Sequence, residues 1–211
     1  MRFDGLLFDI DGTLWDSCAA VCDSWRSSLL RRYSRTDSPD ILQVRSIMGM
    51  TPDKISAKLF GDFGDRAREV FDVLSADECG YLASHGADIY AGVEDTLRDL
   101  AGEYRLFIVS NCQVGYIEAF LQATGLGNCF EDYLCAGSTG LGKSENICSL
   151  MRRRALGRAL YVGDTLADEL AARDAQCAFI YAAYGFGAAA APDAVIHRFG
   201  ELPAVIKGLE G

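Results

Sequence analysis

The sequence predicts an α/β protein with a doubly wound, Rossmann-like parallel sheet and an inserted α-helical cap. Three observations lead to this prediction: short apolar runs that end in glycine or polar residues, helical patterns between the later runs, and one long segment that is helical throughout. Continuous apolar runs of four or five residues are typical of strands that are buried on both faces. We therefore expect strands over residues 6–10, 106–109, 133–136, 159–162 and 177–181.

Apolar residues at helical spacing separate the later strands. They form two sets, which are Val114, Ile117 and Leu121, then Ile147, Leu150 and Met151. Strands that alternate with helices form a parallel sheet through right-handed crossovers. Ligands of such sheets bind beyond the carboxyl ends of the strands. Asp9, Ser110 and Asp164 stand at three of these ends, so we expect the functional site around them.

Residues 15–87 differ from the rest because their pattern is helical from end to end. Apolar residues repeat there along two stripes, which are Val21, Trp25, Leu29 and Ala67, Val70, Phe71, Leu74, Tyr81, Leu82. Pro39 and Pro52 each suit a first helical turn, and Thr51 suits a cap. A simple crossover needs one helix, whereas this segment predicts four. We expect a core of residues 1–14 and 88–211, a cap of residues 15–87, and hinges near 14–16 and 87–92.

The charge balance limits the classes of partner. The chain has 20 basic and 30 acidic residues, so its net charge of −10 repels nucleic-acid phosphates, and the basic run at 152–154 is expected to be a solvated helix face. No apolar run approaches the roughly 20 residues that cross a bilayer. We therefore expect neither nucleic acid nor membrane as a partner. No signal-peptide cleavage site is visible and the cysteines are scattered, which predicts reduced thiols in a cytoplasmic protein.

The most informative segment is Asp9-Ile10-Asp11-Gly12-Thr13, at the end of the first expected strand. A carboxylate can attack phosphorus and form a covalent intermediate, while a second carboxyl protonates the leaving oxygen and then deprotonates water. Two acids this close repel each other, so one of them can hold a proton at neutral pH. Gly12 allows a sharp turn there. An Asx turn or a helix cap is the alternative interpretation of the two aspartates.

With this segment the chain resembles the haloacid dehalogenase superfamily, whose phosphatases carry DxDGT after the first strand. The other signature pieces follow in order across nearly the whole chain. They are Val109-Ser110-Asn111, then Lys143, then Gly163-Asp164-Thr165-Leu166-Ala167-Asp168. The likeness is to the branch of phosphoglycolate phosphatases and β-phosphoglucomutases, which has a helical cap.

The resemblance implies a role for each catalytic position. Asp9 would be the nucleophile that forms an aspartyl-phosphate, and Asp11 the general acid and base. Ser110 and Asn111 would bind the phosphoryl group, because a hydroxyl residue before a helix lies near outward-pointing N–H groups. A plain N-cap is the alternative for Ser110. Lys143 would screen the repulsion between the attacking carboxylate and the phosphate, although Ser144 stands where the family often has proline.

The same resemblance implies a Mg²⁺ site. Hard cations prefer oxygen ligands, and Asp9, the backbone carbonyl of Asp11 and Asp164 would supply three of them. Asp168 would orient a metal-bound water, with Glu169 a weaker candidate for that duty. The cation would neutralise charge on the transferring phosphoryl group.

Residues 137–144 also match the pattern GxxxxGKS of a nucleotide-binding P-loop. In that interpretation Lys143 and Ser144 would contact nucleotide phosphates and Mg²⁺. A P-loop usually follows the first strand of its domain. This segment follows the third expected strand and leaves too little chain for a nucleotide-binding domain, so the P-loop is the less favoured alternative.

The segment Met48-Gly49-Met50-Thr51 joins two expected cap helices, and in similar proteins this loop faces the catalytic centre. Gly49 is therefore a candidate substrate contact. Arg45 and Lys54 flank the loop and either hold a second anionic group of the substrate or are solvated surface charges.

The predicted activity is hydrolysis of a small phosphorylated metabolite. Dehalogenases and phosphonate hydrolases are disfavoured because they usually lack an aspartate equivalent to Asp11. A sugar phosphomutase keeps both aspartates and stays an alternative, as does a catalytically silent protein that binds and regulates a phosphometabolite or a protein. Both a monomer and a homodimer are compatible with the sequence.

Overall fold

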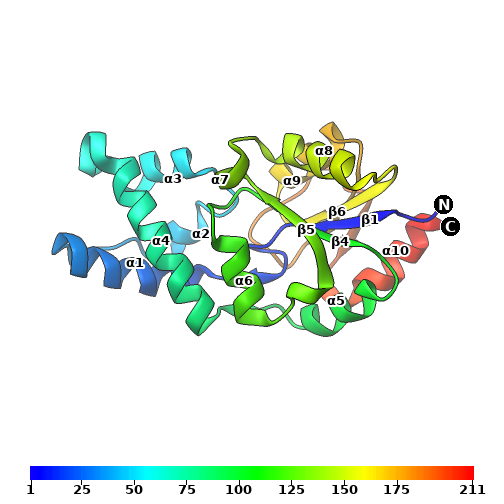
Figure 1. Cartoon of the computed structure of the whole chain (residues 1–211), viewed down its shortest axis with the longest axis horizontal. Helices are drawn as coiled ribbons and strands as arrows, with labels where there is room; N and C mark the ends of the chain where they lie inside the picture. The colour runs from blue at the N-terminus through cyan, green and yellow to red at the C-terminus, as the bar shows by residue number, and fades with distance from the viewer.

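A computed structural model describes the chain over residues 1–211. Its core is a sheet of six parallel strands in the order β5-β4-β1-β6-β7-β8. Figure 1 labels β5, β4, β1 and β6. The strands are β1 (Gly5–Phe8), β4 (Leu106–Ser110), β5 (Phe130–Cys135), β6 (Ala159–Gly163), β7 (Ala178–Ala182) and β8 (Ala194–Ile196). The predicted α/β class is confirmed, and all five expected strands are present. β8 was not predicted, because its three residues are too short to form a recognisable apolar run.

Both faces of the sheet are buried. On β1, Leu6 and Phe8 belong to one hydrophobic cluster, whereas Leu7 belongs to another on the opposite face. Successive side chains of a strand point to opposite faces, so a strand covered on both sides needs apolar residues at every position. This explains why the strands are continuous apolar runs in the sequence.

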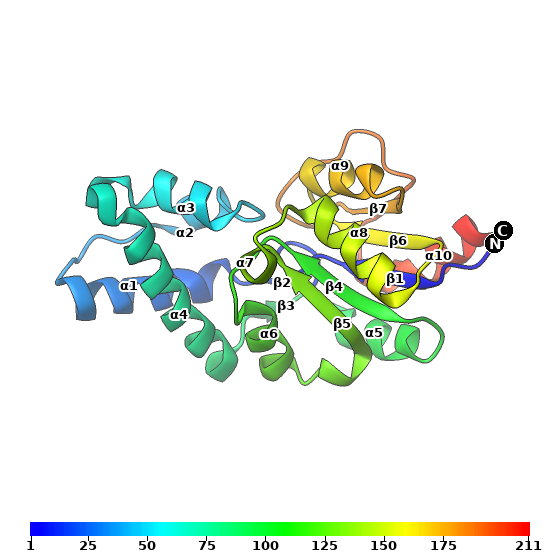
Figure 2. The same ribbon diagram turned by 45° about the horizontal axis from the view of Figure 1, so that its top comes forward.

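Helices cover the two faces of the sheet (Figure 2). Apolar residues of α5 (Val93–Ala101), α6 (Tyr116–Thr124) and α10 (Leu202–Glu210) pack on one face. Those of α8 (Lys143–Arg154) and α9 (Leu166–Asp174) pack on the other. A short helix, α7 (Ala136–Thr139), follows β5. At the end of α8, Arg153 and Arg154 pair with Asp132 of β5 at 2.6 and 2.7 Å, so the basic run is not wholly solvated as predicted.

The start of α6 differs from the prediction. Val114 was expected on its apolar face, but it is 63% exposed and precedes the helix, which begins at Tyr116. Gly115 has a φ of 89°, a left-handed conformation that ends the preceding turn and directs Tyr116 inward. Four other α6 residues, Tyr116, Ile117, Ala119 and Phe120, are buried instead.

Between β1 and β4 lie four helices with a hydrophobic cluster of their own. They are α1 (Cys18–Tyr33), α2 (Ile41–Arg45), α3 (Pro52–Leu59) and α4 (Ala67–His85), with a 3-10 segment at Gly61–Arg66. Trp25 centres this cluster, because its ring meets Phe60 and Phe71 edge-on at 5.4 and 6.1 Å. Pro52 begins α3 as expected, whereas Pro39 lies before α2, whose cap is Asp40.

The chain leaves and re-enters the core at two adjacent points. Strands β2 (Trp15–Asp16) and β3 (Asp88–Ile89) pair antiparallel there. The four helices lie at one end of the molecule and both termini at the other (Figure 1). The division into residues 1–14 with 88–211 and residues 15–87 agrees with this course but stays a prediction. The structure has no helix with both the length and the apolar character that crossing a bilayer requires.

Candidate active site

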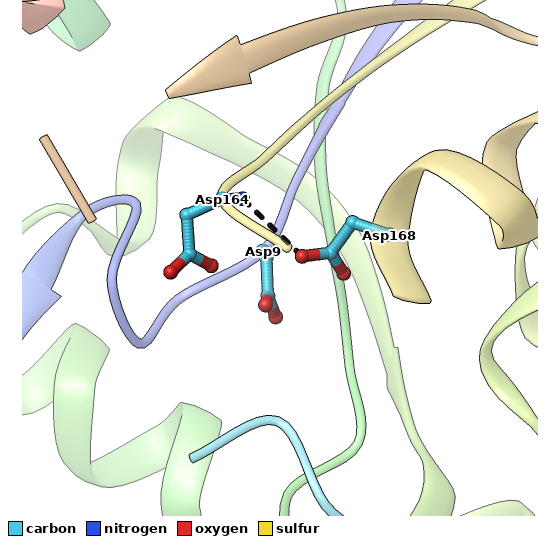
Figure 3. Close-up of side chains that lie close together, drawn as sticks. All are labelled: Asp9, Asp164 and Asp168. Atoms are coloured by element: carbon cyan, nitrogen blue, oxygen red, sulfur yellow. Dashed lines mark hydrogen bonds between the residues drawn. The ribbon is translucent and has the colours of Figure 1, made fainter. Parts of the chain in front are cut away.

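Three aspartates meet at the carboxyl edge of the sheet. Asp9 follows β1, Asp164 follows the neighbouring β6, and Asp168 lies in the first turn of α9. One carboxylate oxygen from each lies within 4.8 Å of the others, and no side chain of the three is appreciably exposed (Figure 3). Residues far apart in the sequence therefore form one buried acidic group.

Lys143 supplies the positive charge next to this group. It is the first residue of α8, and its Nζ lies 2.9 Å from Asp9 Oδ2 and also pairs with Asp168 Oδ1. Burial lowers the pKa of this amine, but Asp168 and Asp9 outweigh the burial and raise the pKa well above its usual value. The lysine therefore stays charged and orients the two carboxylates.

Asp168 uses both of its oxygens in contacts within the protein. Oδ2 accepts hydrogen bonds from the backbone N–H groups of Asp164 and Thr165 and from Thr165 Oγ1, at 3.2, 3.0 and 2.6 Å. Oδ1 accepts from Lys143. These contacts cap α9 and hold the loop that carries Asp164. The structure thus shows Asp168 as an anchor of its neighbours, and its expected role toward a metal-bound water stays a prediction.

Two oxygens of the acidic group have no partner in the protein. Asp9 Oδ1 and Asp164 Oδ1 are buried and accept no hydrogen bond. Burial and the neighbouring carboxylates raise the pKa of Asp164 to about 8. Burial also raises the pKa of Asp9, to about 6, against the opposing effect of Lys143. Free oxygens that converge in a buried, electron-rich space are suited to a hard divalent cation, because unpaired buried charge is otherwise costly.

Two glycines allow the loops to approach Asp164. Gly12 has a φ of 79°, and a Cβ there would lie 2.1 Å from Asp164 Oδ2. A Cβ on Gly185 would lie 2.3 Å from Asp164 Cβ. The next residue, Phe186, donates its backbone N–H to Asp164 Oδ2 at 2.7 Å. The sequence signals a turn at Gly12 but carries no signal for Gly185, whose contact depends on the packing of a distant loop.

Asp11 is held by three donors. Tyr116 OH, Ser17 Oγ and Trp15 Nε1 all donate to its Oδ1, at 2.6, 2.7 and 3.1 Å. Burial raises the pKa of Asp11 although these hydrogen bonds lower it. None of the three contacts uses Oδ2, which is left for a ligand. Tyr116 was not predicted as a site residue, because it lies 105 positions from Asp11 in the sequence.

Ser110 and Asn111 lie where β4 ends beside β1, and both line the same pocket as Asp9 and Asp11. Ser110 is not a helix cap, because α6 begins six residues later and is preceded by Gly115. The helix N-terminus expected next to Ser110 is therefore absent. Asn111 Nδ2 donates to the carbonyl oxygen of Gly49 at 2.9 Å, which joins the core to the loop between α2 and α3.

The structure does not bring Arg45 and Lys54 into this pocket. Arg45 pairs with Asp16 at 2.7 Å, and Lys54 is exposed on α3, which turns Ile55 and Ser56 inward. Gly49 does line the pocket. On an amphipathic helix only one face meets the core, so a charge at position 54 points to solvent while position 55 is buried.

Two further alternatives do not match the geometry. Residues 137–139 of the P-loop pattern belong to helix α7, and Lys143 points to two aspartates, so no phosphate-binding loop is present there. Glu169 accepts hydrogen bonds from the backbone N–H groups of Ala190 and Ala191 and pairs with Arg173 at 2.8 Å. It therefore holds a surface loop and does not serve the acidic group.

Glu78 is a buried pocket residue that was not predicted from the sequence. It lies on α4 and accepts hydrogen bonds from Trp25 Nε1 on Oε2 and from Gln113 Nε2 on Oε1, at 2.5 and 2.9 Å. Burial raises its pKa to about 8, with a smaller contribution from Asp11. Inside the helical stripe of α4 nothing in the sequence distinguishes it from a surface glutamate.

The raised pKa of Glu78 predicts a pH effect on stability. Between about pH 4.5 and about 8 the folded state holds this proton and the unfolded state releases it, so the free energy of unfolding falls as the pH rises. One proton contributes at most about 1.4 kcal/mol per pH unit. The free energy of unfolding, measured by urea denaturation across this pH range, should fall more steeply for the unaltered protein than for Glu78→Gln. Parallel curves would contradict the assignment.

Comparison with known proteins identifies the family of the chain. Residues 6–182 match the haloacid dehalogenase-like hydrolase family. The phosphoglycolate phosphatase of Vibrio vulnificus strain CMCP6 is 30% identical over 225 aligned residues, which cover 95% of each chain. The chain therefore belongs to the haloacid dehalogenase-like hydrolase family, and within that family it is a phosphatase.

Solved structures show the same fold. A haloacid dehalogenase-like hydrolase from Streptococcus pneumoniae superposes with a TM-score of 0.80 at 21% identity, over 96% of this chain and 98% of that one. A predicted phosphoglycolate phosphatase from Haemophilus somnus has a TM-score of 0.77 at 23% identity, over 97% and 98% of the two chains. At these identities the likeness concerns the fold alone.

Proposed function

We propose that the protein is a Mg²⁺-dependent phosphomonoester hydrolase that acts on a small phosphorylated metabolite through an aspartyl-phosphate. The observation that carries the proposal is the buried meeting of Asp9, Asp164 and Lys143, with one unpartnered oxygen on each aspartate. The name of the relatives, phosphoglycolate phosphatase, supports the reaction class.

In the first step an oxygen of Asp9 attacks phosphorus. The bond between phosphorus and the ester oxygen breaks, and the leaving alcohol takes a proton from Asp11. In the second step Asp11 takes a proton from water, which attacks the aspartyl-phosphate, releases inorganic phosphate and restores Asp9. The raised pKa of Asp11 suits the acid role, and Lys143 keeps Asp9 in place for attack.

Asp9, Asp164 and the backbone carbonyl of Asp11 would hold Mg²⁺. When bound, the cation offsets charge on the phosphoryl oxygens. Ser110 and Asn111 follow β4, on the opposite side of Asp9 from Asp164 in the strand order, and would hold the phosphoryl group through hydrogen bonds.

Replacing the nucleophile tests this proposal. We expect Asp9→Asn to lower Mg²⁺-dependent phosphate release from p-nitrophenyl phosphate by at least about 1,000-fold, because an amide cannot form the intermediate. Asp95→Asn, a change of an almost fully exposed aspartate on α5, is the matched control and should retain full activity. Equal activity of Asp9→Asn and the unaltered protein would refute the role of Asp9.

The two alternatives give different results in the same assays. A phosphomutase would convert a sugar 1-phosphate into its 6-phosphate with little free phosphate. A silent binding protein would release phosphate from no ester although it is folded. The small metabolite partner, the monomeric or homodimeric state and the cytoplasmic location stay predictions.

A further inference from the structure

The pocket in front of Asp9 and Asp11 is lined by acidic side chains and by no basic one. It lies between the core and the four helices. Its lining contains the three acids Asp9, Asp11 and Glu78 but no lysine, arginine or histidine. Lys143 touches Asp9 from outside this lining and is already shared with Asp168.

Glu78 is the acid that the proposed chemistry leaves without a role. Its two oxygens accept one hydrogen bond each, from Trp25 and from Gln113, and it has no cationic partner. A carboxyl can accept from both donors, whereas a glutamine side chain has only one acceptor oxygen. The pKa of Glu78, which burial raises to about 8, reflects the same lack of a cation.

The lining also contains the polar side chains of Ser110, Asn111, Gln113 and Tyr116, and most of the remaining wall is apolar. Val21, Ile47, Ile55 and Phe71 form it together with methionines of the loop between α2 and α3. A leaving group beyond the phosphate therefore meets carbon side chains, one carboxyl and the amide of Gln113. A carboxylate on the substrate would lose its hydration here without gaining a positive partner, which is unfavourable.

No basic side chain near the pocket is free to pair with a carboxylate on the substrate. Arg45 is paired with Asp16, and Lys54 is exposed outside the lining. Either form of Glu78 also disfavours a second anion, because the ionised form repels it and the neutral form offers no positive charge.

We propose that the substrate is a phosphate monoester of an uncharged alcohol, and that Glu78 and the base-free pocket select against esters with a second anionic group. This proposal rests on the proposed phosphatase function and narrows its substrate class. Under this proposal phosphoglycolate, the substrate for which the relatives are named, is a poor substrate of this chain, because it carries a carboxylate.

The test compares three esters of similar size. They are 2-hydroxyethyl phosphate, 2-phosphoglycolate and 2-aminoethyl phosphate, whose leaving groups are neutral, anionic and cationic. With the full-length protein and Mg²⁺, kcat/KM for the hydroxyethyl ester should exceed that for phosphoglycolate by at least about tenfold, the factor of one unfavourable polar contact. Equal or faster turnover of phosphoglycolate would overturn the proposal, as would a tenfold preference for the aminoethyl ester.

Variants show which residue is responsible for the preference for the neutral ester over phosphoglycolate. At a pH above the pKa of Glu78, Glu78→Gln should reduce the preference at least about threefold, mainly through a lower KM for phosphoglycolate. Glu69→Gln removes a charge from an exposed position of the same helix and should leave the preference unchanged. Met50→Arg places a cation in the pocket lining and should raise kcat/KM for phosphoglycolate. The Met50→Arg variant therefore tests whether the lack of a base disfavours anionic esters, even if the Glu78→Gln protein does not fold. An unchanged ratio in both pocket variants would refute the assignment.

A binding measurement tests the substrate preference of the pocket independently of the proposed phosphatase activity. In the Asp9→Asn protein with Mg²⁺, calorimetry should give a lower Kd for the hydroxyethyl ester than for phosphoglycolate. Failure of the unaltered protein to hydrolyse any ester would refute the phosphatase, while the two Kd values would still test the pocket. Equal Kd values together with rapid hydrolysis of both esters would refute the pocket preference alone.

Discussion

Lys143→Met is expected to inactivate the enzyme and to destabilise its fold. The methionine replaces the lysine side chain as far as Cε but leaves Asp9 and Asp168 without their shared cation in a buried position. Removal of one partner from a buried ion pair costs about 3–5 kcal/mol. We also expect kcat/KM to fall by at least about 100-fold, because the attacking carboxylate loses its orientation. Urea denaturation and phosphate release measure the two effects.

The control for this variant is Lys207→Met, which changes an exposed lysine on α10 and should alter neither quantity. Saturating Mg²⁺ should recover part of the lost stability, because a divalent cation offsets the same carboxylates. A Lys143→Met protein with nearly normal stability and activity would show that the lysine is not needed to compensate the acidic group.

Gly12→Ala is expected to displace Asp164 and abolish the stabilisation that Mg²⁺ provides. The new Cβ would lie 2.1 Å from Asp164 Oδ2, and the φ of 79° is unfavourable for alanine. A displacement of about 1 Å in an active site can cost about 100-fold in rate. We therefore expect kcat/KM to fall by at least this factor and the shift of Tm with Mg²⁺ to disappear.

The variant Gly64→Ala distinguishes the effect of the contact with Asp164 from that of backbone strain at a positive φ. Gly64 also has a positive φ, of 59°, but nothing lies within 4 Å of the position of its Cβ. This variant should lose about 1–3 kcal/mol of stability from backbone strain and keep its activity and its response to Mg²⁺. An equal loss of activity in both variants would indicate that strain alone, and not the contact with Asp164, explains the effect of Gly12→Ala.

The strands were predictable because burial on both faces leaves a local mark. Leu6, Leu7 and Phe8 must all be apolar when helices cover both sides of the sheet, and this shows as a continuous run. The edge strand β8 leaves no such mark, since only Ile196 of its three residues is buried. The start of α6 was misplaced because the apolar Val114 has the spacing of a helix but lies in the exposed turn before it.

The candidate site was predictable only in part. Asp9, Asp11 and Asp164 stand directly at strand ends, so their meeting follows from a parallel sheet in which β1 and β6 are neighbours. Glu78 and Tyr116 stand on helices, where an acid or a phenol is usually unremarkable. Arg45 and Lys54 show the converse, because charge and position alone suggested a role that the orientation of their helices does not support.

The order of apolar runs, turns and acids along the chain is enough to specify five strands of the sheet, the inserted helices and the aspartates at the strand ends, because each is a pattern of neighbouring positions. The composition of the pocket is different. Glu78 comes from α4, Gln113 from the loop after β4, and Asp11 from the loop after β1. Their proximity, and with it the lack of a base beside the leaving group, arises only when the four helices pack over the sheet, since side-chain contacts between distant segments depend on that packing and not on sequence spacing.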